Sequence, residues 1–409
     1  MTETWSLATL WLGLALAATM ISIWLRIATA LSEIVVGTVA QLIIGAVMSS
    51  TVLGVHEPWI KFLAGTGAIV LTFLAGAELD PTVFKSKWKE ATALGIAGFI
   101  SPFVGCAAVA YYVLGWDGRA SWLAGVALST TSVAVVYAVM LETGLNKTTF
   151  GKTVLAGCFI NDLGTVLALG LIFAPFTVRT MIFVIASILI FVLLPYLTPR
   201  FFKKYGNRPS ELETKFLLLC LFGMGALASW AESEAVLPAY IIGMVLAGTV
   251  GKDHVLIRRL RTVTFGLLTP FYFIRAGSFV SVPTLVAGFS IFLILLLAKM
   301  ATKIVSVYPV TKLFKNPGKE GIYTTLLMST GLTFGSISAL FGLSHNIIDT
   351  AQYSFLIAAV VGSAVVPTLI ANAFFLPRHL LRSTKEPSAA EQEKDLAANI
   401  EKGETSHDR

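Results

Sequence analysis

Charged residues are scarce in this sequence. Asp, Glu, Lys and Arg make up 13% of its 409 residues, and 56% are hydrophobic, whereas a typical soluble domain has about 25% charged residues. A chain of this length with so few charges cannot cover a water-facing surface. The composition therefore argues against a soluble enzyme, a secreted disulfide scaffold or a disordered protein. It predicts a membrane protein with several spanning segments.

Cysteine and histidine are also rare, which bears on cofactors. The three cysteines each lie inside an apolar run without a C-x-x-C neighbour, so we interpret them as small buried hydrophobic residues. The five histidines map to loops, helix ends or the tail, and we expect neither a metal cluster nor a cofactor. The net charge of +7 comes from short basic clusters between apolar runs. That pattern is typical of membrane orientation rather than of nucleic-acid binding.

Long apolar runs make up most of the sequence, and they predict an all-α fold. A helix needs about 20 residues to cross the hydrocarbon core of a bilayer. The first run, Trp5–Leu25, has 21 residues and no basic segment before it, so we expect a retained helix rather than a cleaved signal peptide. We predict about 13 spans, at 5–25, 31–52, 60–79, 91–114, 121–141, 150–174, 180–199, 213–231, 236–250, 263–281, 284–307, 320–343 and 353–376.

The distribution of basic residues predicts the orientation. With the N-terminus outside and thirteen spans, 21 of the 30 Lys and Arg residues fall on the inner side and three on the outer side. Because cytoplasmic loops carry the excess of basic residues, this bias predicts a cytoplasmic C-terminus and a multi-pass location in the cell membrane. Residues 383–409 carry 4 basic and 7 acidic residues and are expected to form a solvated, disordered tail.

One acidic residue lies near the middle of a predicted span. Asp162 follows Asn161 in the sixth span, and no Lys or Arg lies within a helical turn of it. Charged groups at this depth are costly and face a cavity or a partner, so a proton, a cation or a neighbouring helix must neutralise the carboxylate. The residues alone leave two interpretations open. The carboxylate exchanges a proton for a cation, or it makes a structural hydrogen bond between helices.

Two spans contain small polar residues at mid-depth. Ser129–Ser132 are four consecutive hydroxyl residues in the fifth span, and Ser329–Ser336 in the twelfth span are rich in Ser, Thr and Gly. Hydroxyls either bond to their own helix or coordinate a hard cation, and unwound backbone at this depth must line a cavity or be buried in protein. Paired interrupted helices are typical of transporters built from inverted repeats. Spans four to six would then match spans eleven to thirteen.

Further ionisable residues lie in or beside the spans. Lys299 lies deep in the eleventh span and is expected to need a polar partner, whereas Lys303, one turn later, is expected to extend to the cytoplasmic surface. Arg275 cannot lose its charge and needs an acidic group, a carbonyl or water. Glu78 and Glu33 lie at the inner ends of the third and second spans. We expect both glutamates at the interface between membrane and water, and a position at the mouth of a cavity is the alternative for Glu78.

Together these residues resemble the monovalent cation:proton antiporter superfamily, and most of all the NapA-like sodium/proton antiporters. The similarity covers nearly all of residues 5–380, and the ordered set of motifs is more specific than any one of them. The motifs are Thr131-Ser132, Met140–Gly144, Ala156–Gly164 with its Asn161-Asp162 pair, Pro270–Gly277, Lys299 and Met328–Gly335.

The resemblance implies a fold of the NhaA/NapA kind. That fold has inverted repeats, two unwound helices that cross at the binding site, and a core that moves against a dimerisation domain. Residues 1–382 would form the transmembrane antiporter domain, followed by the tail. The implied parts are a dimerisation part at about 1–80 and 210–281, a core at about 91–174 and 284–380, and a linker helix at about 180–199.

The resemblance also implies roles for single residues. Asp162 corresponds to the aspartate that binds Na⁺ or protons, and Thr131 corresponds to a ligand on a crossing unwound helix. Ser132 and Asn161 complete the predicted ion-binding set. The predicted supporting residues are Lys299, Arg275, Thr130 and Glu78, and the predicted unwound-helix residues are Gly331, Thr333 and Gly335.

Three positions depart from the family pattern. In that family the Asn161-Asp162 pair goes with electroneutral exchange, whereas electrogenic members have two aspartates. Electroneutral members often carry arginine at the position of Lys299, and Arg275, at a usually apolar position, is a candidate to replace it. Thr38 stands where many relatives have a glutamate.

We therefore predict a secondary antiporter, not an enzyme, that exchanges Na⁺ or Li⁺ for H⁺ by alternating access with 1:1 stoichiometry and serves pH homeostasis. A K⁺/H⁺ antiporter of the same architecture is the first alternative. A sodium-coupled organic-anion symporter, a cation channel and a non-transporting membrane scaffold are less favoured. The predicted partners are monovalent cations, protons, the lipid bilayer and a second copy of the chain, with no nucleic acid.

Overall fold

The computed structural model describes residues 2–25, 27–47, 53–77, 81–173, 177–206, 211–231, 233, 235–315 and 318–382. Within these ranges the chain forms helices and connections, and no strand. Nine helical segments in the described part are long and apolar enough to cross a membrane, judged by length and composition. The predicted all-α, multi-pass fold is confirmed.

Ten of the predicted spans correspond to one helix each, and the helix of the fourth span has a kink at Lys87, before the predicted span begins. The connections between them are short, as expected for a bundle without an inserted soluble domain. These helices are α1 (Thr2–Leu25), α2 (Thr29–Val47), α3 (Pro58–Ala77), α4 (Pro81–Tyr112), α7 (Thr149–Phe173), α8 (Val178–Tyr205), α9 (Leu212–Trp230), α10 (Val236–Leu246), α14 (Phe289–Leu313) and α17 (Thr350–Ile370).

The other three spans are divided. The pairs are α5 (Gly118–Ser129) with α6 (Val133–Thr143), α11 (His254–Val263) with α12 (Thr269–Ser278), and α15 (Gly318–Met328) with α16 (Thr333–Ser344). A π-helical turn at Thr264–Leu268 joins α11 to α12, so the helical stretch begins well before the predicted span. Smaller elements are a 3₁₀ turn at Leu145–Lys147, α13 (Val282–Ala287), a π-helical turn at Ala371–Phe375 and α18 (Arg378–Arg382).

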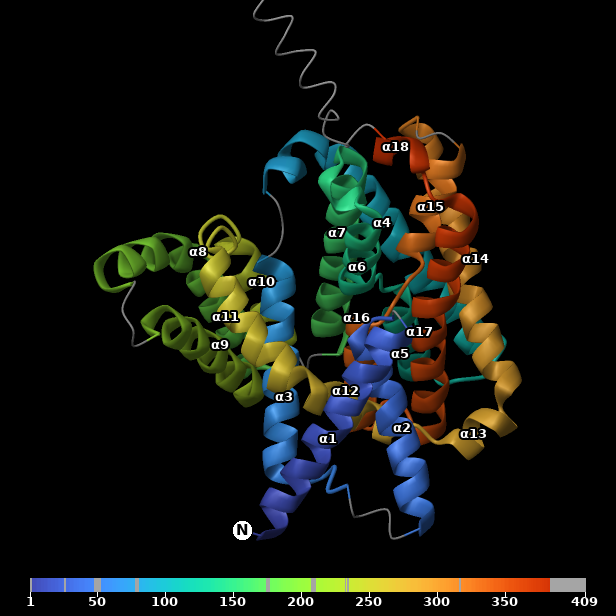
Figure 1. Cartoon of the computed structure of the whole chain (residues 1–409), viewed down its shortest axis with the longest axis horizontal. Helices are drawn as coiled ribbons and strands as arrows, with labels where there is room; N and C mark the ends of the chain where they lie inside the picture. Colours follow the sequence, from blue (N-terminus) through green and yellow to red (C-terminus); the bar gives the residue numbers. More distant parts are fainter. Residues whose placement is uncertain are drawn as a thin grey trace, which may run out of the picture.

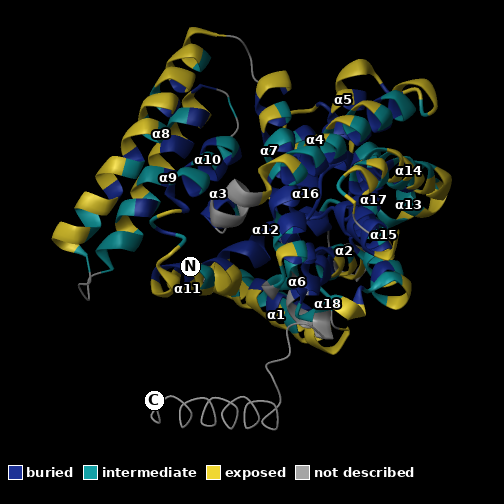
Figure 2. Cartoon of the chain, turned by 90° about the horizontal axis from the view of Figure 1, so that it is seen from above, coloured by how far each residue is buried: buried dark blue, intermediate teal, exposed yellow. Residues whose placement is uncertain are grey.

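The helices pack in two groups (Figure 1). In the first group, α3 packs against α10 and α12, α2 packs against α1 and α12, and α8 packs against α9 and α10. In the second group, α4 packs against α5, α7 and α14, and α14 packs against α15 and α17. Figure 2 shows the buried residues gathered around α7, α12 and α16, whereas the outward faces of α8 and α14 are exposed. Those exposed faces are apolar, as lipid-facing surfaces must be.

Glycines set the closest helix contacts of the first group. Gly76 and Gly243 lie where α3 crosses α10, and Gly37 and Gly277 lie where α2 crosses α12. A Cβ atom at any of these four positions would overlap the carbonyl group of the facing helix. Small residues are favoured at helix crossings in membranes for this reason, and they hold α2, α3, α10 and α12 in direct backbone contact.

The second group contains two triplets of helices in the same order. Each consists of a continuous helix, an interrupted helix and another continuous helix: α4, α5 with α6, α7, and then α14, α15 with α16, α17. We call residues 130–132 the first break and residues 329–332 the second break. The order matches the predicted pair of triplets. The division of labour between a moving core and a dimerisation part stays a prediction.

Candidate ion-binding site

The two breaks are bonded directly to each other. All of their residues are buried. The Ser132 N–H donates to the Thr330 carbonyl at 3.1 Å, and Thr131 Oγ1 donates to the Met328 carbonyl at 2.8 Å. Unwound backbone at membrane depth must be satisfied by protein or water, and here the first break donates to one carbonyl of the second break and to one at the end of α15. The predicted crossing of two unwound helices is confirmed.

Hydroxyl side chains lie at the C-terminal ends of α5 and α15, the first halves of the two interrupted helices. Ser129 and Thr130 donate to carbonyls three residues earlier in α5, at 2.8 and 3.1 Å. Ser329 and Thr330 donate to carbonyls four and three residues earlier in α15, both at 2.7 Å. These bonds satisfy carbonyls that a helix C-terminus leaves free. Thr131 differs from these four residues because its hydroxyl donates to the Met328 carbonyl at the end of the other interrupted helix.

Two of the three predicted unwound-helix residues are helical. Gly331 lies in the second break, but Thr333 and Gly335 lie in the first turns of α16. The reason for the glycine at 335 is packing, since a Cβ atom there would meet a side-chain carbon of Val360 at 2.8 Å and the Ala127 carbonyl at 2.9 Å. This glycine lets α16 approach α5 and α17.

Asn161 and Asp162 lie in α7 beside the second break. Their side chains have 0% and 1% exposure. One turn earlier, Cys158 Sγ lies 3.5 Å from Met328 Sδ, which places this face of α7 against the end of α15. Within the described chain, both polar atoms of the Asn161 amide and Oδ1 of Asp162 have no hydrogen-bond partner. Buried polar atoms without partners are costly, so these atoms are available to a ligand.

Two lysines of α14 reach the two breaks. Both are fully buried. Lys303 Nζ donates to Thr131 Oγ1 at 2.9 Å in the first break. Lys299 Nζ has no hydrogen-bond partner among the described residues and lies against Gly331 of the second break, where a Cβ atom would overlap it. The prediction that Lys303 extends to the surface is wrong, because the first break offers its ammonium group a hydroxyl inside the protein.

The lysines and the aspartate form one electrostatic cluster. Lys303 and Lys299 both lie close enough to Asp162 to interact with it electrostatically. Neither lysine forms an ion pair with Asp162 in the described part of the chain. Two buried lysine side chains therefore lie near a carboxylate whose Oδ1 keeps room for a ligand.

Other predicted residues lie elsewhere. Arg275 is half-buried in α12, where Nε donates to the Val55 carbonyl at 2.9 Å and the guanidinium lies 5.0 Å from the ring centroid of Phe279. The structure does not bring Arg275 to the breaks. Glu78 lies outside the described residues. Glu33 is 2% exposed and lies near the start of α2. Its position at the membrane interface stays a prediction.

The fold and the site together define a class of protein. Two interrupted helices that meet beside a buried carboxylate, each the middle member of a helix triplet, are the architecture of a secondary membrane transporter. The sodium/hydrogen exchanger transmembrane family model matches residues 13–376, and the chain belongs to this family. The resemblance to the cation:proton antiporter superfamily is confirmed.

Relatives and solved structures agree with this assignment. The chain is 25% identical over 356 residues to probable Na⁺/H⁺ antiporter 3 of Methanocaldococcus jannaschii, covering 82% of this chain and 89% of that protein. It is 24% identical over 360 residues to a Na⁺/H⁺ antiporter of Enterococcus hirae, covering 82% and 91%. The structure of the sodium proton antiporter MjNhaP1 from M. jannaschii at pH 8 has a TM-score of 0.68 at 17% identity, covering 94% of this chain and 99% of that one. It has the same fold.

Two features of the site were missed by reasoning from sequence. The first is the role of Lys303, although its spacing of four residues from Lys299 places both on one helix face. The second is the shared Ser-Thr pair, at 129–130 and again at 329–330. That repeated pair is a visible signal of corresponding helix ends.

Proposed function

We propose that this protein exchanges Na⁺ or Li⁺ for H⁺ across the cell membrane by alternating access. It acts as an antiporter rather than an enzyme, as a homodimer and without a bound cofactor. Membership of the sodium/hydrogen exchanger family supports exchange, and Na⁺/H⁺ antiporters among its relatives support the choice of ion. The excess of basic residues on one side, 21 against three, supports an outer N-terminus and a cytoplasmic C-terminus.

The buried and unpaired carboxylate of Asp162 carries this proposal. A carboxylate removed from water needs one positive charge close to it, and either a proton or one small cation supplies that charge. Because both occupy the same group, each excludes the other. Binding one on the first side of the membrane and the other on the second side then produces exchange.

Oxygen atoms for a cation shell lie around the breaks. The Thr131 hydroxyl, backbone carbonyls of the breaks and water are hard ligands of the kind that such cations take. The lone pairs of Thr131 Oγ1 now accept from Lys303, so an arriving cation displaces that ammonium group or shares the hydroxyl with it. The Asn161 amide, which has no partner, is free to bond the carboxylate or its ligand, and Lys299 lies against the second break.

The single carboxylate of Asp162 supports a 1:1 stoichiometry. Asn161 is neutral, so the Asn161-Asp162 pair offers one charge to titrate. A site that carries one proton in one direction and one monovalent cation in the other moves no net charge. We propose that the second helix group moves as the core and that the first group, α1–α3 with α8–α12, is the dimerisation part.

Proton movement in liposomes tests the proposal. Purified protein is reconstituted in vesicles with an acidic interior, and Na⁺, Li⁺ or K⁺ is added outside while an internal dye reports pH. We expect Na⁺ and Li⁺ to release the gradient in the natural chain and not in Asp162→Asn. A response to K⁺ alone would assign potassium exchange, and a response unchanged in Asp162→Asn would refute the role of Asp162.

A further inference from the structure

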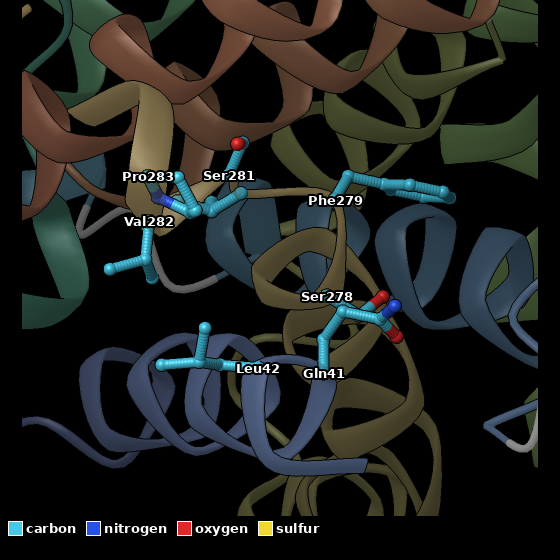
Figure 3. A pocket seen from close by; sticks show the side chains of 8 residues that line it. Gln41, Leu42, Ser278, Phe279, Ser281, Val282 and Pro283 are labelled. Atoms are coloured by element: carbon cyan, nitrogen blue, oxygen red, sulfur yellow. The ribbon is translucent and has the colours of Figure 1, made fainter. Parts of the chain in front are cut away.

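A groove separates α2 from α14 and α17. Its deep part is a cavity of about 350 Å³, lined by α2 from Ile34 to Val39, by the start of α14 and by α17 from Ile357 to Gly362. Its outer part is a cavity of about 390 Å³, lined by the end of α2 and the α12–α13 connection, which Figure 3 shows in close-up. Val280 lines both cavities, so the groove is continuous.

The polarity of the groove follows depth in the bilayer. The α12–α13 connection joins two spans, so the outer part lies near a bilayer surface. It contains the side chains of Gln41 and Ser278, which line the pocket in Figure 3. From Gln41 to Ile34 the groove then descends along about 10 Å of helix into apolar surroundings.

The deep part offers water at most one polar side chain. Thr38 is the one residue with a polar side chain among those that line it. Its hydroxyl is already engaged by the Ile34 and Gly277 carbonyls, at 2.9 and 3.0 Å. A buried water needs two to four polar partners, and an empty cavity forfeits the dispersion contacts of its walls. A hydrocarbon chain needs no polar partner and restores the dispersion contacts of the walls, so it suits this cavity better than water or empty space.

The groove is open to the lipid phase. Val35, Val39 and Phe289 line it and are 46%, 45% and 60% exposed. At the outer end, Phe279 forms part of the wall, and the Arg275 guanidinium lies over the ring of Phe279. A positive charge therefore stands near the polar end, and no carboxylate is among the residues that line either cavity.

We propose that this groove binds a bilayer phospholipid. One acyl chain fills the deep part between α2 and α17, and the ester and phosphate region lies at Gln41, within reach of the positive field of Arg275. The bound lipid would lie between the two helix groups, because α2 belongs to the first group and α14 and α17 belong to the second. This inference concerns binding and does not depend on the proposed exchange.

Photo-crosslinking tests the site directly. The protein is reconstituted in vesicles of phosphatidylethanolamine and phosphatidylglycerol that contain a small fraction of phosphatidylcholine with a diazirine in one acyl chain. After irradiation and digestion, mass spectrometry locates the labelled peptides. We expect label concentrated on α2 at 34–39 and on α17 at 357–362. Val39→Trp and Ala358→Phe, which fill the groove, are expected to lower this label about tenfold.

The control is a bulky residue on the same lipid-facing surface outside the groove. Val305 lies on α14, is 72% exposed and does not line either cavity, so Val305→Trp should leave the labelling unchanged. Equal melting temperatures of the three variants would exclude misfolding as the cause. Label spread evenly over the lipid-facing helices, or label at α2 that persists in both groove-filling variants, would overturn the proposal.

Discussion

At the scale of single residues, Lys299 and Lys303 give the site its electrostatic character. They lie one turn apart on α14, and each ammonium group reaches a different break. The ends of α5 and α15 at these breaks carry the partial negative charge of helix C-termini. This charge and the Thr131 hydroxyl offset part of the cost of burying two ammonium groups. The arrangement holds positive charge near Asp162 without filling its ligand position.

Replacing Lys303 with methionine should strengthen cation binding. Lys303→Met is an unbranched side chain of similar size, removes an ammonium group that interacts with Asp162 and frees a lone pair of Thr131 Oγ1. We expect the apparent KM for Na⁺ to fall about tenfold, which corresponds to about 1.4 kcal/mol. The measurement is Na⁺-driven proton flux in vesicles at alkaline pH, where proton competition is weak. Lys303→Arg, which keeps the charge, should not lower KM, and an equal KM in both variants would contradict this role.

At the scale of elements, the breaks show what sequence patterns can and cannot predict. Hydropathy predicted the spans because lipid-facing helices need long apolar runs, and four consecutive hydroxyl residues marked the first break. The exact limits of the second break were not predictable, because Gly331 and Gly335 look alike in sequence. One lies against a lysine in unwound backbone, whereas the other allows a helix crossing. Only the packed neighbours distinguish the two.

A methyl group at Gly331 tests the contact between the second break and α14. A Cβ atom there would overlap Lys299 Nζ and crowd Thr130 Oγ1, so Gly331→Ala should lower stability by about 1–3 kcal/mol and reduce exchange. Combination with Lys299→Met removes one of the overlapping groups and should recover part of the loss in melting temperature. Additive effects of the two substitutions would show that the residues do not interact. Gly223→Ala in α9, where the added Cβ meets nothing within 4 Å, is the matched control.

At the scale of the whole molecule, two buried tyrosines link the helix groups. Tyr240 of α10 donates to the Phe159 carbonyl of α7 at 2.9 Å, and Tyr353 of α17 donates to the Ala276 carbonyl of α12 at 2.6 Å. Sequence reasoning did not find these bonds, because a tyrosine in an apolar run shows neither its partner nor its helix group. The direction of Lys303 and the burial of Glu33 were missed for the same reason, since each depends on what the neighbouring helix offers.

Removing these tyrosine hydroxyls should change how often each relative position of the two helix groups is populated. In the alternating access that we propose, one group moves against the other, so a bond across them would stabilise only some positions. Tyr240→Phe and Tyr353→Phe should each change the population ratio about fivefold, from about 1 kcal/mol per hydrogen bond. Spin labels at Ile185 on α8 and Val305 on α14 would report the change as altered distance populations. Tyr323→Phe removes a bond within the second group and should leave these populations unchanged.

The central claim is that one carboxylate carries either a proton or a cation. Titration calorimetry of Na⁺ binding, repeated in two buffers with different ionisation enthalpies, counts the protons released for each Na⁺ bound. We expect one proton per Na⁺ at pH values where Asp162 is protonated, and no Na⁺ binding in Asp162→Asn. Binding of Na⁺ to Asp162→Asn, or binding to the natural chain without proton release at every pH, would contradict the account.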